Sequence, residues 1–114
     1  MRLTDIIRLA HAKLVSGSDP DRHNIQKAFS SDLMSDVLTL DEEHILLITG
    51  LANLQCIRTA EMADIEVVLL ARNKRATPEM IELAEEVGIV LLESPFSIFK
   101  LSGILYENGL HPVY

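Results

Sequence analysis

Short apolar runs alternate with amphipathic segments over the second half of the chain. The runs cover residues 45–49, 66–71 and 89–92 and are typical of buried strands. The segments between them, over residues 54–64, 77–88 and 94–108, carry apolar side chains at helical spacing. Strands and helices that alternate with short connections favour right-handed crossovers and a parallel sheet. This half of the chain predicts an α/β fold, with helices packed on the faces of a mainly parallel sheet.

Two of the predicted helices have local start signals. Thr77 is a capping residue followed by Pro78 at the first helical position, and Gly88 closes the same helix. Ser94–Pro95 repeats this start for the last helix. The connections between strands and helices are therefore predicted to be short and ordered.

The first forty residues give weaker signals. Thr4 is predicted to cap a helix over residues 5–12, and a short strand follows over residues 14–17. Residues 18–24 are rich in Pro, Asp and Asn, which predicts a turn before a second strand over residues 25–30. Residues 31–40 repeat a Ser-Asp-apolar-apolar pattern, which predicts a short amphipathic helix. No linker divides the chain, so residues 1–114 are expected to form a single domain.

Composition and charge exclude several classes of function. The 114 residues are 48% apolar and carry a net charge of −7, and no Lys/Arg stripe is present to bind a phosphate backbone. We therefore expect neither nucleic-acid binding nor, with apolar runs far shorter than about 20 residues, a membrane span. Cys56 is the one cysteine, which excludes an internal disulfide and fits a cytoplasmic location. The four histidines lie at no ligand spacing, so a zinc site is not expected.

The loops that follow the predicted strands carry the candidate binding residues. Ligands of parallel α/β sheets bind beyond the carboxyl ends of the strands, where loop amides and helix N-termini are available. The candidates are Thr49, Gly50, Asn53, Gln55, Arg58, Thr59, Arg72, Asn73 and Ser94. Their chemistry suits a small anionic or amide-bearing molecule. The alternative is that they are ordinary solvated loop residues and helix caps.

Asp32 and Asp36 raise a second possibility. On a helix they would lie one turn apart, as a Mg²⁺ site or an acid/base pair would require. The alternative, which we favour, makes Ser31 a helix cap and Asp32 an acid of the first turn, with no metal bound. The sequence lacks a P-loop, a G-x-G-x-x-G, a G-x-S-x-G and an H-E-x-x-H motif, so no catalytic residue is assigned.

The last predicted helix carries apolar residues on more than one face, including Phe99 and Tyr106. A surface helix needs only one apolar stripe, so the excess indicates either full burial or an association surface. We expect a homodimer, with docking of a partner enzyme through this helix as the alternative.

Several segments together resemble the DRTGG domain family. They are Ser31–Leu38, Leu47–Asn53, Arg58–Ala60, Ser94–Ser97 and Gly103–Tyr106, in the order that the family shows. The resemblance covers nearly the whole chain, although a contiguous Asp-Arg-Thr-Gly-Gly string is absent. It implies a fold like that of the N-terminal domain of HPr kinase/phosphorylase. Similar domains occur in some phosphate acetyltransferases and beside CBS domains.

The resemblance implies a regulatory or ligand-sensing module rather than an enzyme. The expected ligand is a small anionic metabolite, such as a nucleotide or a phosphorylated compound, and no cofactor is expected. Two other hypotheses stay open: an interaction module that docks a partner enzyme, and a weak Mg²⁺-dependent enzyme that uses Asp32 and Asp36.

Overall fold

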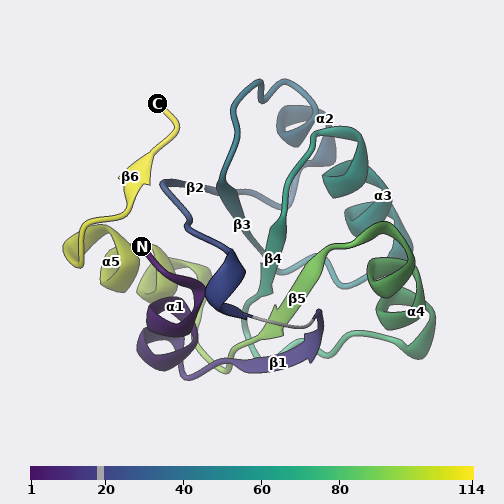
Figure 1. Cartoon of the computed structure of the whole chain (residues 1–114), viewed down its shortest axis with the longest axis horizontal. Coiled ribbons are helices and arrows are strands. Elements are labelled where there is room, and N and C mark those ends of the chain that lie inside the picture. Colours follow the sequence, from purple (N-terminus) through teal and green to yellow (C-terminus); the bar gives the residue numbers. More distant parts are fainter. Residues whose placement is uncertain (18–19) are drawn as a thin grey trace.

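Helices cover both faces of a central sheet in the computed structural model, which describes residues 1–17 and 20–114 (Figure 1). The α-helices are α1 (Leu3–Ala10), α2 (Met34–Val37), α3 (Leu54–Met62), α4 (Pro78–Val87) and α5 (Ile98–Glu107). The strands are β1 (Lys13–Ser16), β2 (Lys27–Ser30), β3 (Ile45–Thr49), β4 (Val67–Leu70), β5 (Val90–Glu93) and β6 (His111–Pro112). A 3₁₀-helix, η1, spans Pro20–Arg22, within the stretch predicted as a turn, of which residues 18 and 19 lie outside the described residues.

The six strands are arranged in the order β1-β5-β4-β3-β2-β6. All neighbouring pairs are parallel except β1 with β5, which is antiparallel. All residues of β3, β4 and β5 are buried, as expected for parallel strands covered on both faces. The predicted single α/β domain with a mainly parallel sheet is confirmed.

Two apolar clusters lie on opposite faces of the sheet. One joins α2, α3 and α4 to side chains such as Leu47 and Leu70, and the other joins α1 and α5 to Leu46 and Leu69. Alternate residues of β3 and β4 therefore belong to different clusters, in keeping with the two-residue period of a strand. The two helical layers lie on opposite sides of the sheet in Figure 1.

Several local predictions are wrong at helix starts. Helix α1 begins at Leu3, so Thr4 lies inside the helix instead of capping it. The cap of α5 is Ser97, whose side chain accepts from the Lys100 amide, rather than Ser94. The helix predicted over residues 31–40 is reduced to α2, which has no side-chain cap. Strand β6 was not predicted at all.

The start of α4 follows its sequence signal. The Thr77 hydroxyl accepts from the Met80 amide, Pro78 occupies the first turn, and Gly88 ends the helix with a left-handed φ of 80°. Among the described residues, no helix combines the length and the apolar composition needed to cross a membrane.

Candidate functional site

The candidate site is the edge of the sheet where the parallel strands end. The register aligns Thr49 of β3 with Leu70 of β4, and Leu70 with Glu93 of β5. The loops that follow are tied together by backbone bonds: the Ala71 amide donates to Thr49 (2.8 Å) and the Ser94 amide donates to Leu70 (2.8 Å). The loops predicted to converge at one edge therefore do so.

A carboxylate that follows β2 organises the turn after β3. Asp32 Oδ1 accepts from the Thr49 hydroxyl at 2.9 Å and from the Gly50 amide at 2.7 Å. The Thr49 Oγ1 in turn accepts from the Leu51 amide at 3.1 Å. This network fixes the Thr49–Gly50 backbone and satisfies the buried Thr49 side chain.

The same network corrects the interpretation of Asp32 and Asp36. Asp32 precedes α2 and is not a first-turn acid, because its carboxylate bonds across to β3. Ser31 does not cap α2 either, since its hydroxyl accepts from the Leu33 amide in a local turn. The two carboxylates are therefore not spaced by a helical turn, and no group of metal-binding side chains occurs within the described part of the chain.

Arg72 lies directly over Gly50. A Cβ atom added to Gly50 would lie 2.7 Å from Arg72 Nη2 and 2.9 Å from Nε. Only glycine therefore leaves the guanidinium in this position. None of the ion pairs found between described residues involves Arg72, so its charge is available at the edge.

The loop that carries Arg72 is held in an unusual backbone conformation. Arg72 and Asn73 have φ values of 59° and 60°, in the left-handed region that most side chains avoid. Their amides donate to the carbonyls of Phe96 (2.7 Å) and Ser94 (2.9 Å), which pins the loop against the segment after β5. These bonds fix the direction of the Arg72 and Asn73 side chains, but they leave neither amide free for a ligand.

Two further side chains shape this edge, and neither was among the predicted site residues. Lys100 Nζ lies 3.8 Å from the centroid of the Phe96 ring, which also contacts the His11 ring at 4.9 Å between centroids. Glu93 is buried, and its carboxylate accepts from the Ala76 amide (2.7 Å) and from Arg75 Nη1 (3.3 Å). The helical and strand patterns give no signal for the contacts of Phe96 with His11 or of Glu93 with Arg75 and Ala76, because these contacts join segments distant in the sequence.

The remaining predicted residues differ in whether their side chains are available to a ligand. Asn53 caps α3, and its side chain accepts from the Cys56 amide at 3.0 Å. Gln55 and Arg58 are exposed on α3, whereas Thr59 is buried in the same helix. Ser94 is buried as well, and its hydroxyl donates to the Ala10 carbonyl and accepts from the Phe96 amide. Ser94 thus joins α1 to the loop after β5.

Cys56 does not provide a nucleophile. Burial, and secondarily the negative charge of Asp32, raises the pKa of the Cys56 thiol to about 12. The thiol is therefore protonated at neutral pH, and the thiolate is the reactive form of cysteine. Cys56 is accordingly a small apolar residue of the core.

Comparison with known proteins gives the fold and little else. No protein-family description matches the sequence, and no curated protein matches it either. A solved structure does match: the CBS and DRTGG domains of the regulatory region of a Clostridium perfringens pyrophosphatase, in complex with its activator diadenosine tetraphosphate. The match has a TM-score of 0.79 and 16% sequence identity, and it covers 98% of this chain and 48% of that chain. The chain therefore shares the fold of about half of that regulatory region.

Proposed function

We propose that this protein is a non-catalytic regulatory domain of the DRTGG type, which binds a small anionic metabolite or a nucleotide at the carboxyl edge of its sheet. The fold is that of part of a regulatory region whose structure holds a nucleotide activator, which supports this class of function. The proposed site rests on one observation: the Arg72 guanidinium lies over Gly50 and forms no ion pair with a carboxylate of the described residues. The likeness to the N-terminal domain of HPr kinase stays a prediction.

Local charge favours an anion at this edge despite the net charge of −7. Arg72 and Lys100 present cations there, while the nearby carboxylates of Asp32 and Glu93 already accept two hydrogen bonds each. A guanidinium can form two parallel hydrogen bonds to a phosphate or carboxylate. Asn73 and Arg58 are the next polar contacts that we propose for the ligand.

A thermal-shift titration with diadenosine tetraphosphate, ATP and pyrophosphate tests the site. We expect at least one of them to stabilise the protein, by about 2.7 kcal/mol at 100 times its Kd, which corresponds to several degrees in Tm. Arg72→Ala should abolish the shift. Gly50→Ala should weaken it strongly with little loss of stability, because the added Cβ displaces only the end of the flexible Arg72 side chain.

Arg22→Ala is the matched control, since it removes the same charge from η1, which lies near Gly88 and Val90 at the start of β5, the end of that strand opposite to the carboxyl edge. It should leave the shift unchanged. A shift that persists in Arg72→Ala would refute the proposed site, and the absence of any shift with the three compounds would count against binding of a nucleotide or a phosphate compound.

We also propose that the protein forms a homodimer through the outer face of α5. This face is defined by Phe99, Lys100, Gly103, Tyr106 and Glu107, which recur at helical spacing and are all exposed. Phe99 and Tyr106 are 89% and 68% exposed, and a Cβ on Gly103 would meet nothing within 4 Å. A glycine inside a helix costs about 1 kcal/mol relative to alanine, and no contact with the described residues explains Gly103. A second α5 packed antiparallel at Gly103 would use the open space.

Sedimentation equilibrium tests the dimer. We expect association at micromolar concentration, and Phe99→Glu should shift the protein to monomer by placing a charge in the apolar contact. Met62→Glu is the matched control, because Met62 is also a largely exposed apolar side chain, on α3 in the opposite helical layer. A native protein that stays monomeric, or equal dissociation by both variants, would contradict the proposed interface. The buried thiol of Cys56 fits a reducing cytoplasm, which is where we propose that the dimer acts.

A further inference from the structure

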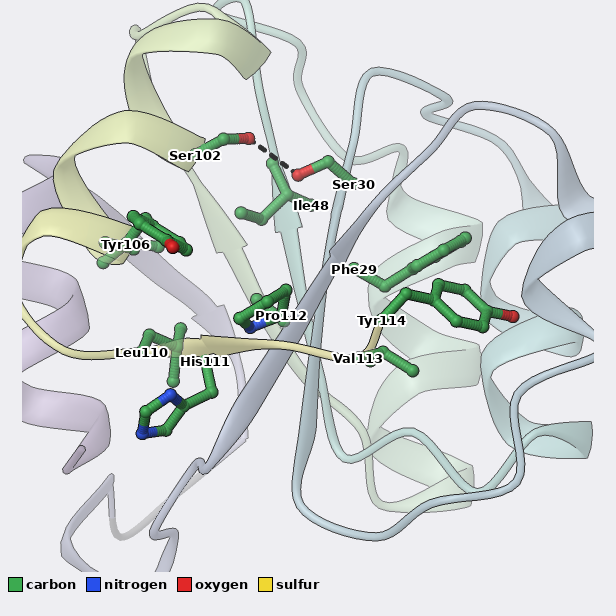
Figure 2. Close-up of a pocket in the computed structure, with 12 residues that line it drawn as sticks. Phe29, Ser30, Ile48, Ser102, Tyr106, Leu110, His111, Pro112, Val113 and Tyr114 are labelled. Atoms are coloured by element: carbon green, nitrogen blue, oxygen red, sulfur yellow. Dashed lines mark hydrogen bonds between the residues drawn. The ribbon is translucent and has the colours of Figure 1, made fainter.

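A cavity of about 300 Å³ lies beside the sheet at β2 and the edge strand β6. Its volume is at the lower end of the range for small-molecule sites, which is about 300–1,000 Å³. Figure 2 shows Tyr106 of α5 and Pro112 of β6 on opposite sides of it, with Ser30 and Ser102 at one end. None of the candidate residues of the carboxyl edge lines this cavity.

The walls of the cavity are apolar. On the α5 side of the sheet the lining includes Ala28, Ile48, Leu105 and Leu110 from the cluster that joins α1 and α5 to the sheet. The register pairs Ala28 with Pro112, which can occupy this position because the edge strand needs no further amide donor there. The lining contains no Lys, Arg, Asp or Glu. An uncharged, apolar molecule therefore fits it better than an anion.

Two serine hydroxyls form the polar end of the cavity, and their hydrogen bonds determine what a ligand can bind there. The Ser102 hydroxyl donates its one proton to the Ile98 carbonyl at 2.7 Å. Ser102 and Ser30 are also hydrogen-bonded, with 2.7 Å between their Oγ atoms, so the proton of that bond must come from Ser30. Ser30 Oγ therefore has no proton left to donate, and its two lone pairs can only accept. A ligand that forms a hydrogen bond with Ser30 Oγ must do so through an N–H or O–H group.

We infer that the cavity binds a planar, uncharged bicyclic ring that lies between Tyr106 and Pro112 and donates an N–H to Ser30 Oγ. Aromatic rings pack favourably against a tyrosine ring and against the flat face of a proline. The Ser30 Oγ acceptor at the end of the slot fixes the orientation of the ring. This site is separate from the proposed anion site, and either can exist without the other.

Indole and benzothiophene separate the packing of the ring from its hydrogen bond to Ser30 Oγ, because the two compounds have nearly the same shape and only indole has an N–H. Both would be titrated into ¹⁵N-labelled protein and followed by amide chemical shifts. We expect the amides of Ala28, Ser30, Leu105 and Tyr106 to move, with indole bound roughly two- to tenfold more tightly than benzothiophene, as one hydrogen bond would give.

Three variants, one of them a control, test where the two rings bind. Ser30→Ala should bring the ratio of the two affinities to about one while benzothiophene still binds, and Ser35→Ala, another exposed serine, should leave the ratio unchanged. Ala28→Leu should fill the cavity and abolish binding of both rings, with dispersed amide signals as evidence that it folds. Three results would overturn the inference: no shifts at these amides, a preference for indole that survives Ser30→Ala, or movement of the Ala28 and Ser30 amides of β2 with protein concentration alone, which would mean that a second copy covers the cavity and not only the outer face of α5.

Discussion

Asp32→Ala is expected to lower the free energy of unfolding by about 2 kcal/mol, and by up to about 3 kcal/mol. The loss arises because the Thr49 hydroxyl and the Gly50 amide, both in buried residues, would lose a charged acceptor at 2.9 and 2.7 Å. Neither donor has a second hydrogen-bond acceptor among the described residues. Urea denaturation measures the change, and hydrogen exchange at Gly50 should report the opened turn directly.

Asp36→Ala is the control for this prediction. Asp36 is a neighbouring exposed aspartate, and its carboxylate makes no hydrogen bond or ion pair with the described residues, so its removal should change stability by less than about 0.5 kcal/mol. Asp32→Asn should fall between the two, because its amide oxygen can still accept but carries no charge. Equal effects of Asp32→Ala and Asp36→Ala would show that the network does not stabilise the fold.

The central part of the fold could be predicted from the sequence because its signals are local. The five-residue apolar run Ile45–Thr49 is buried throughout, and the Thr77–Pro78 start and the Gly88 stop set the limits of α4. Apolar runs and helix caps depend on residues close together in the chain. They therefore predict the alternation of β3, β4 and β5 with α3 and α4, and with it a parallel sheet.

The errors fall where contacts between distant segments override a local pattern. Residues 31–40 have a helical pattern, but the Asp32 carboxylate bonds to β3, so the backbone becomes helical only from Met34. Ser94 precedes a proline like a helix cap, but its hydroxyl is bonded to the Ala10 carbonyl of α1, and the helix begins four residues later at Ile98. Strand β6 is two residues long and contains a proline, so its own sequence gives no strand signal.

The candidate site also has features that the sequence predicts and features that depend on contacts between distant segments. The convergence of the loops after β3, β4 and β5 follows from parallel strands in register, and the sequence predicts it. The position of the Arg72 guanidinium over Gly50 depends on two successive left-handed residues and on bonds from their amides to Ser94 and Phe96. Neither the backbone angles nor these pairings leave a pattern in the sequence. Burial of Thr59 and Ser94 is likewise set by packing.

Leu69→Ala is expected to have the largest effect on stability, a loss of about 3 kcal/mol within a range of about 2–5 kcal/mol. Leu69 has 0% exposure and lies at the centre of β4, one of the two middle strands of the sheet, facing the layer of α1 and α5. Truncation would leave a cavity that cannot close, because neighbouring strands fix the backbone on both sides. The midpoint of urea unfolding should fall by roughly 1–3 M.

Leu33→Ala gives the matched comparison, since it removes the same atoms from a side chain that is 57% exposed. Its cost should stay below about 1 kcal/mol, because little apolar surface returns to water. Burial of Leu69 beneath α1 and α5 requires that Leu69→Ala lower the free energy of unfolding much more than Leu33→Ala does. Similar losses would mean that the α1 and α5 layer does not pack on the sheet as described, and the cavity beside β2 and β6, which that layer encloses, would lose its wall as well.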